Sequence, residues 1–460
     1  MGEAFFLSIF ILIIIIYSVQ NPTLKVSFLT LLFISCWANV DFFPSWQDGL
    51  LTINSWVMAT KIMILVGALA ILLMLDPLSQ KRESHAPVLI LMVALGSILL
   101  VSASNWMSVY LAIELPTLSL FILAAQKRGS GYSAEAGLKY FVLGALSSGL
   151  FLFGCALLCG LTGGTSIPCI DLVLNQGSGP VFHTSGVMTP IGGLLITGAL
   201  LFKLSAAPFH MWAPDVYDGA PTTTTALLAT VPKIGIFSIL VSIGPVANVL
   251  LIGTISSMVV GALGALNQTK IKRLLAYSGI AHMGFVLWGI EIGSFESVQA
   301  SLIYMILYVI MSICAFTMVL ALGGLKNLIV EFSGLSRREP VLAVTLALTF
   351  LSIAGIPPLV GFFSKWWVLL SGITYQYYLV SVLAVVCSVV AGVYYVRIVK
   401  IIYFQADSFF LVGLKTLREK KRINFRKSLL IGASLYPIGF MIISPNLLLQ
   451  LAHWATVGLF

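Results

Sequence analysis

The chain has 460 residues, of which 59% are hydrophobic and only 9% are charged, and its formal net charge is +9. A typical soluble domain carries about 25% charged residues, so this composition excludes an ordinary water-soluble protein. Apolar runs of about 20 residues, long enough to cross a bilayer, recur from one end of the chain to the other. Because these runs are continuous and lack the ~10-residue alternation of barrel strands, we predict an all-α polytopic membrane protein.

Hydropathy, read together with turn and charge signals, predicts 14 transmembrane helices in the sequence. Spans 7 and 12 contain prolines and are predicted to be broken helices. The expected spans, in chain order, are 3–19, 25–43, 55–76, 87–103, 105–125, 134–162, 188–211, 221–245, 247–267, 272–290, 297–324, 340–371, 377–404 and 428–451.

The distribution of charge supports this count. Of the 25 lysine and arginine residues, 20 lie in or beside the connections that follow odd-numbered spans. The connections after even-numbered spans carry acidic residues instead, namely Asp41, Asp48, Asp171, Glu291 and Glu296. The positive-inside rule therefore places the basic connections on the matrix or cytoplasmic side, which we call the basic face, and both termini on the opposite side. The positive charge is explained by topology, so we expect no nucleic-acid partner.

The remaining five basic residues fall inside predicted spans. Burying one lysine at the centre of a bilayer costs on the order of 2.5–3.5 kcal/mol, so several such residues indicate a function. Glu114 is their acidic counterpart in the middle of span 5, and Pro116 weakens the helix beside it. Because loss of hydration favours the neutral form of an amine, these groups are suited to pass protons. The five residues are Lys61, Lys139, Lys203, Lys233 and Lys365.

Two of these lysines lie beside helix breaks. Lys203 precedes Pro208 in KLSAAPFHMW, and Lys365 follows the prolines of AGIPPLVGFFSKWW. Broken helices free backbone carbonyls and admit water, which gives protons a local path. We expect His282 in span 10 to be either a relay residue or a packing residue. The alternative for Glu114 is a static ion pair with one lysine.

Lys61 differs from the other lysines, because it lies near the start of span 3 and its stem could extend to the membrane interface. We therefore expect it to have no role in proton transfer.

The pairing of two interrupted helices in corresponding halves is typical of transporters with inverted repeats. Spans 4–8 and 9–13 are the candidate five-helix repeats. The expected organisation is an N-terminal three-helix segment at 1–85, the first repeat at 86–245, the second repeat at 246–405, and a basic loop with a C-terminal helix at 406–460.

The six cysteines do not form a metal or cluster motif, because no CxxC pair occurs in the sequence. Cys155 and Cys159 lie one helical turn apart in an apolar run, where free thiols pack as small hydrophobic groups. No glycine-rich dinucleotide turn follows a strand. We therefore expect no metal and no redox cofactor in this chain.

Several segments of the chain are similar to a known family. The segments are YLAIELPTLSLFILAAQKR, AEAGLKYFVLGALSSGLFLFG, LLFKLSAAPFHMWAPDVYDGAPTTTTALLATVPKIGIF, NQTKIKRLLAYSGIAHMGF and LSIAGIPPLVGFFSKWW. They resemble NADH dehydrogenase subunit 2, the antiporter-like N subunit of respiratory complex I, over roughly residues 85–405. The residues of these segments are closer to those of plant, algal or protist mitochondrial versions than to those of animal ones. Residues 1–80 and 406–427 carry little resemblance.

The resemblance implies roles for residues at matching positions. Glu114 and Lys203 are expected to form a charged pair that gates a half-channel from the basic face, and Lys139 is expected to modulate that pair. Lys233 is the expected central relay residue and Lys365 the terminal one. The implied function is proton translocation as a subunit of the H⁺-translocating NADH:ubiquinone reductase, with no redox or quinone site in this chain.

The resemblance also implies a location and partners. NADH, FMN, iron–sulfur clusters and ubiquinone are expected in other subunits, and the partners are other membrane-arm subunits, including neighbouring antiporter-like ones. The expected location is the mitochondrial inner membrane, with both termini in the intermembrane space. Cardiolipin or another phospholipid is a candidate ligand near the basic loops. The alternatives are a subunit of a cation/proton antiporter or membrane-bound hydrogenase, a solute transporter, and a structural scaffold.

Overall fold

A computed structural model describes residues 47–48, 51–75, 85–127, 129–168, 170, 188–244, 249–322, 328–405 and 424–460. The spans predicted at 3–19 and 25–43 lie outside these residues. The described chain is helical apart from one short antiparallel hairpin, which pairs β1 (Gln47–Asp48) with β2 (Leu51–Thr52).

The first four described helices lie where hydropathy predicts them. The Asn105 side chain caps the third of these helices by accepting a hydrogen bond from the Met107 amide at 3.1 Å, so a very short turn suffices to separate it from the helix before it. The fourth helix ends at Gly163, whose φ of 71° is readily adopted only by glycine. The helices are α3 (Ser55–Met74), α4 (Ala86–Ser102), α5 (Trp106–Ala124) and α6 (Gly131–Thr162).

Both predicted broken helices are confirmed. Span 7 consists of α9 (Met188–Leu204) and α10 (Trp212–Gly219), separated by residues 205–211, so it extends eight residues beyond its predicted end at 211. Span 12 consists of α17 (Pro340–Ala354) and α18 (Val360–Thr374). In each case the first half-helix ends without a following helical turn, so its last carbonyl groups need partners from elsewhere.

Two further interruptions were not predicted. Span 8 divides at Thr230 into α11 (Thr222–Ala229) and α12 (Val231–Ile243), because Pro232 has no amide hydrogen with which to continue the helix. The prediction of one continuous helix at 428–451 is wrong. Residues 441–445 separate α21 (Phe425–Phe440) from α22 (Asn446–Val457), and Pro445 directly precedes α22.

The remaining helices complete the bundle. Seven segments of the described chain are long and apolar enough to cross a membrane, and shorter apolar helices accompany them. Between α15 (Phe295–Leu322) and α17 lie a short 3-10 turn, η1 (Ile329–Phe332), and α16 (Leu335–Arg338). The other three helices are α13 (Val249–Ala265), α14 (Ile271–Ile292) and α19 (Tyr378–Phe404).

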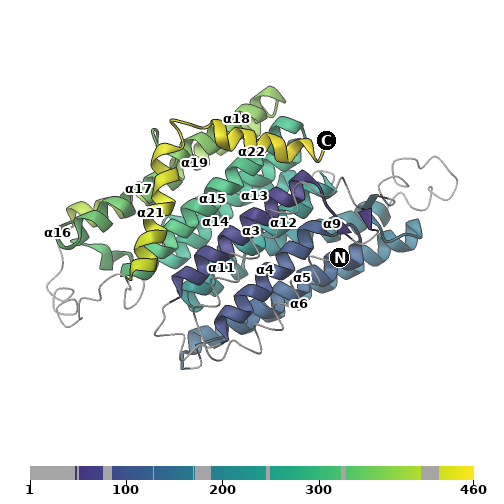
Figure 1. The fold of residues 1–460 in the computed structure, drawn as a ribbon, viewed down its shortest axis with the longest axis horizontal. Coiled ribbons are helices and arrows are strands. Elements are labelled where there is room, and N and C mark those ends of the chain that lie inside the picture. The colour runs from purple at the N-terminus through teal and green to yellow at the C-terminus, as the bar shows by residue number, and fades with distance from the viewer. Residues whose placement is uncertain are drawn as a thin grey trace.

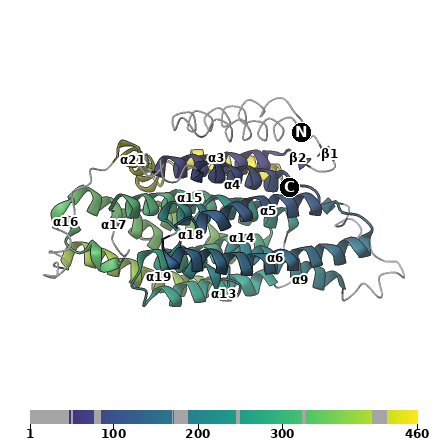
Figure 2. The same cartoon turned by 90° about the horizontal axis from the view of Figure 1, so that it is seen from below.

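Helices α14 and α15 form the centre of the bundle. Helix α14 packs against α10, α13, α15 and α18, and α15 packs against α3, α11, α17, α18, α21 and α22. Figure 1 shows α14 and α15 in the middle of the bundle, and Figure 2 shows α3 and α4 on one side of this centre and α6 and α13 on the other. The outer helices α6 and α19 keep apolar side chains such as Leu146 and Val389 exposed, as expected for lipid-facing surfaces.

Helices α13 and α14 approach each other more closely than side chains would allow. A Cβ atom at Gly261 would lie 2.5 Å from the Ala281 amide nitrogen, and one at Gly284 would lie 2.5 Å from the Ser257 hydroxyl. The two backbones are therefore in direct contact along a seam lined by glycine, a packing mode that is common between membrane helices.

Candidate functional site

Glu114 lies in the middle of α5, two residues before Pro116. The Thr117 hydroxyl donates a hydrogen bond to the backbone carbonyl of Glu114 at 2.9 Å and contacts its Oε2 atom at 3.3 Å. The Oε1 atom is buried and has no hydrogen-bond partner in the described part of the chain. A buried carboxylate oxygen without a partner is costly, so this atom is available to a hydrogen-bond donor.

Lys203 lies in the last turn of α9, directly before the helix break. Its Nζ atom donates to the hydroxyl of Ser148 on α6 at 3.4 Å. Within the described residues no ion pair of 4 Å or less joins Lys203 to Glu114, although the two charges attract each other over a longer distance. The predicted contact pair is therefore open in this structure, and Ser148 takes the place of the carboxylate.

Lys139 lies on α6 near the basic face and is 40% exposed. It forms ion pairs with Glu135, one turn earlier on the same helix, at 2.7 Å and with Asp215 of α10 at 2.9 Å. The Asp215 carboxylate also contacts Arg273 of α14 at 3.1 Å. Lys139 thus belongs to a network of charges that joins three helices, and it does not contact Glu114 or Lys203.

Lys233 lies on α12 just beyond the interruption at Thr230, and it is 1% exposed. Its Nζ atom lies 5.7 Å from the centre of the Tyr308 ring on α15, within the range of a cation–π interaction. Gly279 of α14 leaves space for this contact, since a Cβ atom there would lie 3.1 Å from the Tyr308 hydroxyl and 3.5 Å from Lys233 Nζ.

His282 of α14 lies beside Lys233 in the core. Its Nδ1 atom shares a hydrogen bond of 2.7 Å with the Tyr304 hydroxyl, and its ring centre lies 5.5 Å from that of Tyr308. Tyr308 therefore contacts both Lys233 and His282. The imidazole and phenol groups provide hydrogen-bonding atoms in a region that is otherwise apolar.

Lys365 lies on α18, beyond the second helix break, and is 7% exposed. Its Nζ atom donates to the Ala354 carbonyl at the end of α17 at 2.7 Å and lies 5.8 Å from the centre of the Phe285 ring. Phe285 in turn stacks on Tyr304. A continuous buried row thus crosses the core, in the order Lys233, Tyr308, His282, Tyr304, Phe285 and Lys365.

Lys61 corrects an expectation from the sequence. It was predicted to extend to the membrane interface, but it is only 4% exposed. Helix α3 is covered by α4, α12, α15 and α22, so the Lys61 side chain lies inside the bundle and does not reach the surface.

Three residues of this region were missed by sequence reasoning. Tyr304 and Tyr308 lie one helical turn apart within an apolar helix, a pattern that does not differ from ordinary core packing. Asp215 lies in WAPDVYDG, next to the recognised helix break. A carboxylate so near a lysine-bearing break was the available signal, but its partners on α6 and α14 are distant in sequence.

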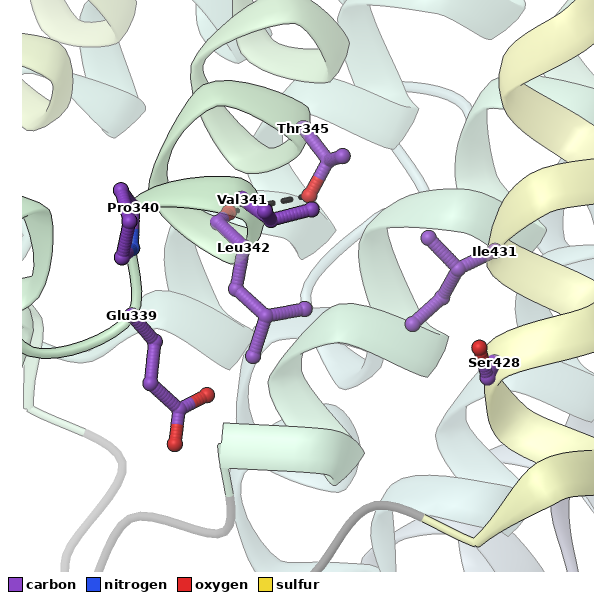
Figure 3. Close-up of a pocket in the computed structure, with 7 residues that line it drawn as sticks. All are labelled: Glu339, Pro340, Val341, Leu342, Thr345, Ser428 and Ile431. Carbon is purple, nitrogen blue, oxygen red and sulfur yellow. Dashed lines mark hydrogen bonds between the residues drawn. The ribbon is translucent and has the colours of Figure 1, made fainter.

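A separate cleft opens near the start of α17 and α21 (Figure 3). Its volume is about 340 Å³, and its lining is mostly apolar. None of the buried lysines lines it. The lining residues are Glu339, Pro340, Val341, Leu342, Thr345, Ser428 and Ile431. Among the residues that the structure describes, no three histidine, cysteine, aspartate or glutamate side chains are grouped so that they could hold a metal ion.

Buried lysines beside broken helices, arranged around a central pair of membrane helices, define an antiporter-like membrane protein. Comparisons with protein families agree with this class. Residues 103–391 match the family described as NADH:quinone oxidoreductase/Mrp antiporter, and residues 4–100 match the N-terminal model of NADH dehydrogenase subunit 2. The chain therefore belongs to the NADH:quinone oxidoreductase/Mrp antiporter family, in its NADH dehydrogenase subunit 2 branch.

Individual relatives support this assignment. The chain is 92% identical over 374 residues to NADH-ubiquinone oxidoreductase chain 2 of Metridium senile, a match that covers 81% of this chain and 97% of the relative. It is 40% identical to NADH-quinone oxidoreductase subunit N of Parvibaculum lavamentivorans, over 78% of this chain and 76% of the relative. A chain of respiratory complex I from Thermus thermophilus has the same fold, with a TM-score of 0.84, 27% identity, and coverage of 98% of this chain and 99% of that chain.

The comparisons correct two expectations from the sequence. Residues 1–80 were expected to carry little family resemblance, yet residues 4–100 match a family model; their apolar composition had hidden the pattern. The expected similarity to plant, algal or protist versions over animal ones is also wrong, because Metridium senile is a sea anemone.

Proposed function

We propose that this chain is a membrane-arm subunit of a proton-translocating NADH:ubiquinone reductase and that it moves protons through its buried lysines. The observation that carries the proposal is the position of Lys233 and Lys365, which are 1% and 7% exposed and lie at the two ends of one row of aromatic residues and histidine. Burial of a single lysine is costly in a membrane. Two such lysines around one histidine form an arrangement suited to proton exchange.

The first part of the relay lies in the first half of the chain. Glu114 has a buried oxygen free to take a proton, and Lys203 lies at the end of α9, where the helix is broken. Protons from the basic face reach this pair when the distance between the two charges changes. In the open arrangement Lys203 is bonded to Ser148; closure onto Glu114 favours the charged form of the lysine.

The second part of the relay runs through the centre of the bundle. Lys233 and His282 both contact Tyr308, and His282 is oriented by its hydrogen bond to Tyr304. Imidazole has two nitrogen atoms, so it can accept a proton at one and release it from the other. Lys365 is the terminal group of the row. Its ammonium donates to the Ala354 carbonyl, and a charged donor forms a stronger hydrogen bond than a neutral one.

The proposed topology is 14 spans, with inverted repeats at 86–245 and 246–405, in the mitochondrial inner membrane and with both termini on the intermembrane-space side. A correspondence between the two breaks supports the repeats. The Phe202 carbonyl at the end of α9 accepts a bond from Trp212 Nε1 at 3.0 Å, and the Ala354 carbonyl at the end of α17 accepts one from Lys365 Nζ at 2.7 Å. In both halves a side chain beyond the break satisfies a carbonyl before it.

Electron transfer takes place in other subunits of the proposed assembly, which carry NADH, FMN, iron–sulfur clusters and ubiquinone. The neighbours of this chain are antiporter-like and other membrane-arm subunits.

The cleft between α17 and α21 is a proposed site for an acyl chain of cardiolipin or another acidic phospholipid. The cleft is mainly apolar, and the exposed Arg337 and Arg338 of α16 directly precede its Glu339. These arginines would attract a phosphate at the basic face. Filling the cleft with Leu342→Trp should lower the amount of cardiolipin that copurifies with the complex, whereas an unchanged amount would contradict the site.

The function is tested by Lys233→Met, which preserves side-chain bulk but removes the ionisable group. In the complete complex reconstituted into vesicles, we expect this variant to assemble and to lose much of the proton pumping per NADH oxidised. Lys400→Met is the matched control, because Lys400 is exposed on α19 and outside the row. Unchanged pumping in the assembled Lys233 variant would exclude the relay, and proton exchange stimulated by sodium or potassium without NADH oxidation would favour an antiporter.

A further inference from the structure

Asp215 is shared by two cations that come from different halves of the chain. Its Oδ2 atom accepts from Lys139 of α6 at 2.9 Å, and its Oδ1 atom accepts from Arg273 Nη2 of α14 at 3.1 Å. In the proposed repeats, α6 and α10 belong to the first and α14 to the second. Asp215 is thus a direct link between the two halves at the basic face.

Arg273 has the capacity to hold this carboxylate more tightly. Its Nε atom is buried and has no hydrogen-bond partner in the parts of the chain that the structure describes. A guanidinium group can bind both oxygens of a carboxylate in parallel through two nitrogen atoms. The unused Nε donor therefore offers Oδ2 of Asp215 a second partner besides Lys139.

Helix α10, which carries Asp215, is joined to both neighbouring helices by further contacts. On the side of α6, Trp212 stacks on Tyr140 with ring centres 4.8 Å apart. On the side of α14, Lys272 Nζ donates to the Ala220 carbonyl at 2.8 Å, and Lys270 pairs with Asp218 at 2.6 Å. The short helix therefore lies between the two halves and is attached to each by charged groups.

The position of α10 bears directly on the first charged pair of the relay. Trp212, one turn before Asp215, donates its indole N–H to the Phe202 carbonyl at 3.0 Å. Phe202 is the neighbour of Lys203 in the sequence. On the other side, Arg273 and His282 lie on the same helix, α14. A shift of α10 relative to α14 thus changes the surroundings of Lys203. It also changes the contact between Asp215 and Arg273 on α14, the helix that carries His282.

We propose that Asp215 is a positioning residue that exchanges between two arrangements, one shared by Lys139 and Arg273 and one bound to Arg273 alone. The proposal rests on the proton relay described above. While Lys139 is bonded to Asp215, Asp215 holds α10 against α6. When the Lys139 ammonium turns to Glu135 alone, Asp215 closes onto the guanidinium with both oxygens, and the part of α10 that carries it is drawn toward α14. The side chains of Lys139 and Asp215 are each 40% exposed. Ion pairs between side chains so exposed contribute little to stability, so the exchange costs little free energy.

The direct test is Asp215→Asn in the complete reconstituted complex, with proton pumping and NADH oxidation measured together. Asparagine keeps the shape of the side chain and removes the charge. Pumping per NADH should fall at least about fivefold, the lower end of the range typical for coupled sites, and Asp215→Glu should restore most of it. Glu296→Gln is the matched control, because it also removes one negative charge but Glu296 is exposed in the first turn of α15, and it should leave pumping close to that of the unaltered protein.

A second variant keeps the proposal open to refutation if Asp215→Asn fails to assemble. Arg273→Gln retains the Lys139–Asp215 pair and removes the second position, so pumping should fall to a similar extent. The double variant with Asp215→Asn should be no worse than either single variant. Normal pumping in assembled Arg273→Gln, or equal losses in Asp215→Asn and Glu296→Gln, would overturn the proposal. Loss of pumping in Lys233→Met together with normal pumping in Asp215→Asn would leave the relay intact and exclude only this coupling.

Discussion

Lys365 and Ala354 lie on opposite sides of the break between α17 and α18, and the Lys365 ammonium donates to the Ala354 carbonyl at 2.7 Å. Gly355, with a φ of 85°, ends α17 and presses closely against the Lys365 side chain. The lysine thus satisfies a backbone group that the broken helix leaves without its usual partner. One side chain therefore has both a structural role and a role in the proposed relay.

The two roles of Lys365 can be separated by substitution. Lys365→Arg keeps a donor for the carbonyl but remains protonated under all ordinary conditions, so the complex should assemble normally and pump poorly. Lys365→Met removes the donor as well, and it should also lower the thermal stability of the complex, by about 1–3 kcal/mol for the unsatisfied carbonyl. Vesicle pumping assays and thermal unfolding of the purified complex measure the two effects. Equal pumping by the arginine variant and the unaltered protein would show that Lys365 does not release protons.

The hydroxyl of Tyr304 orients His282 through a bond of 2.7 Å. Tyr304→Phe removes only this oxygen and retains the ring that stacks on Phe285. We expect slower proton pumping at unchanged levels of assembled complex, because the imidazole loses the bond that fixes its orientation. Tyr436→Phe is the control, since Tyr436 is exposed on α21 and stacks on Phe440, outside the row. An identical rate in the two variants would contradict the assigned role of the hydroxyl.

Gly279 provides the space in which Lys233 and Tyr308 meet. Gly279→Ala would place a methyl group 3.1 Å from the Tyr308 hydroxyl and 3.5 Å from Lys233 Nζ, so the Tyr308 hydroxyl must shift by a few tenths of an ångström. We expect a loss of pumping although alanine favours the helix by up to about 1 kcal/mol. Gly149→Ala on α6 meets no atom within 4 Å and should be neutral in the same assay. A neutral Gly279→Ala would show that the Lys233–Tyr308 contact is unimportant for transport.

Trp212 satisfies the Phe202 carbonyl at the first helix break through a bond of 3.0 Å. Trp212→Phe retains an aromatic ring against Tyr140 but removes the donor. The expected result is a loss of roughly 1–3 kcal/mol in stability, with reduced pumping because the end of α9 carries Lys203. Differential scanning of the purified complex and the vesicle assay report the two quantities. Full stability in the phenylalanine variant would indicate that the carbonyl finds another partner.

Much of the helical framework could be predicted because lipid imposes length and polarity on each span. Prolines near Lys203 and Lys365 located both broken helices. The interruption at Thr230 and the division at 441–445 were not foreseen, since a proline at a helix start and a proline that separates two helices look alike in sequence. Hydropathy also could not show which side of α3 is covered, and this is why Lys61 was expected at the interface.

The buried lysines were identified from their cost in a membrane, whereas their partners were not. Lys139 was expected to modulate Glu114 and Lys203. Of its two contacts, Glu135 follows from the spacing of four residues on one helix, whereas Asp215 on α10 does not follow from the sequence. The choice of partner depends on how α6, α10 and α14 meet, and no local pattern in the sequence determines that meeting. The contribution of Tyr304 and Tyr308 was missed for the same reason.

The glycine-lined seam between α13 and α14 has a mechanical consequence. Two helices whose backbones touch cannot slide past one another without collision, so α13 and α14 form one rigid unit inside the subunit. Any movement during a transport cycle must then be confined to other, shorter parts of the bundle. The eight-residue α10 is bonded through side chains to α6 and to α14, and it is short enough to move relative to that rigid unit.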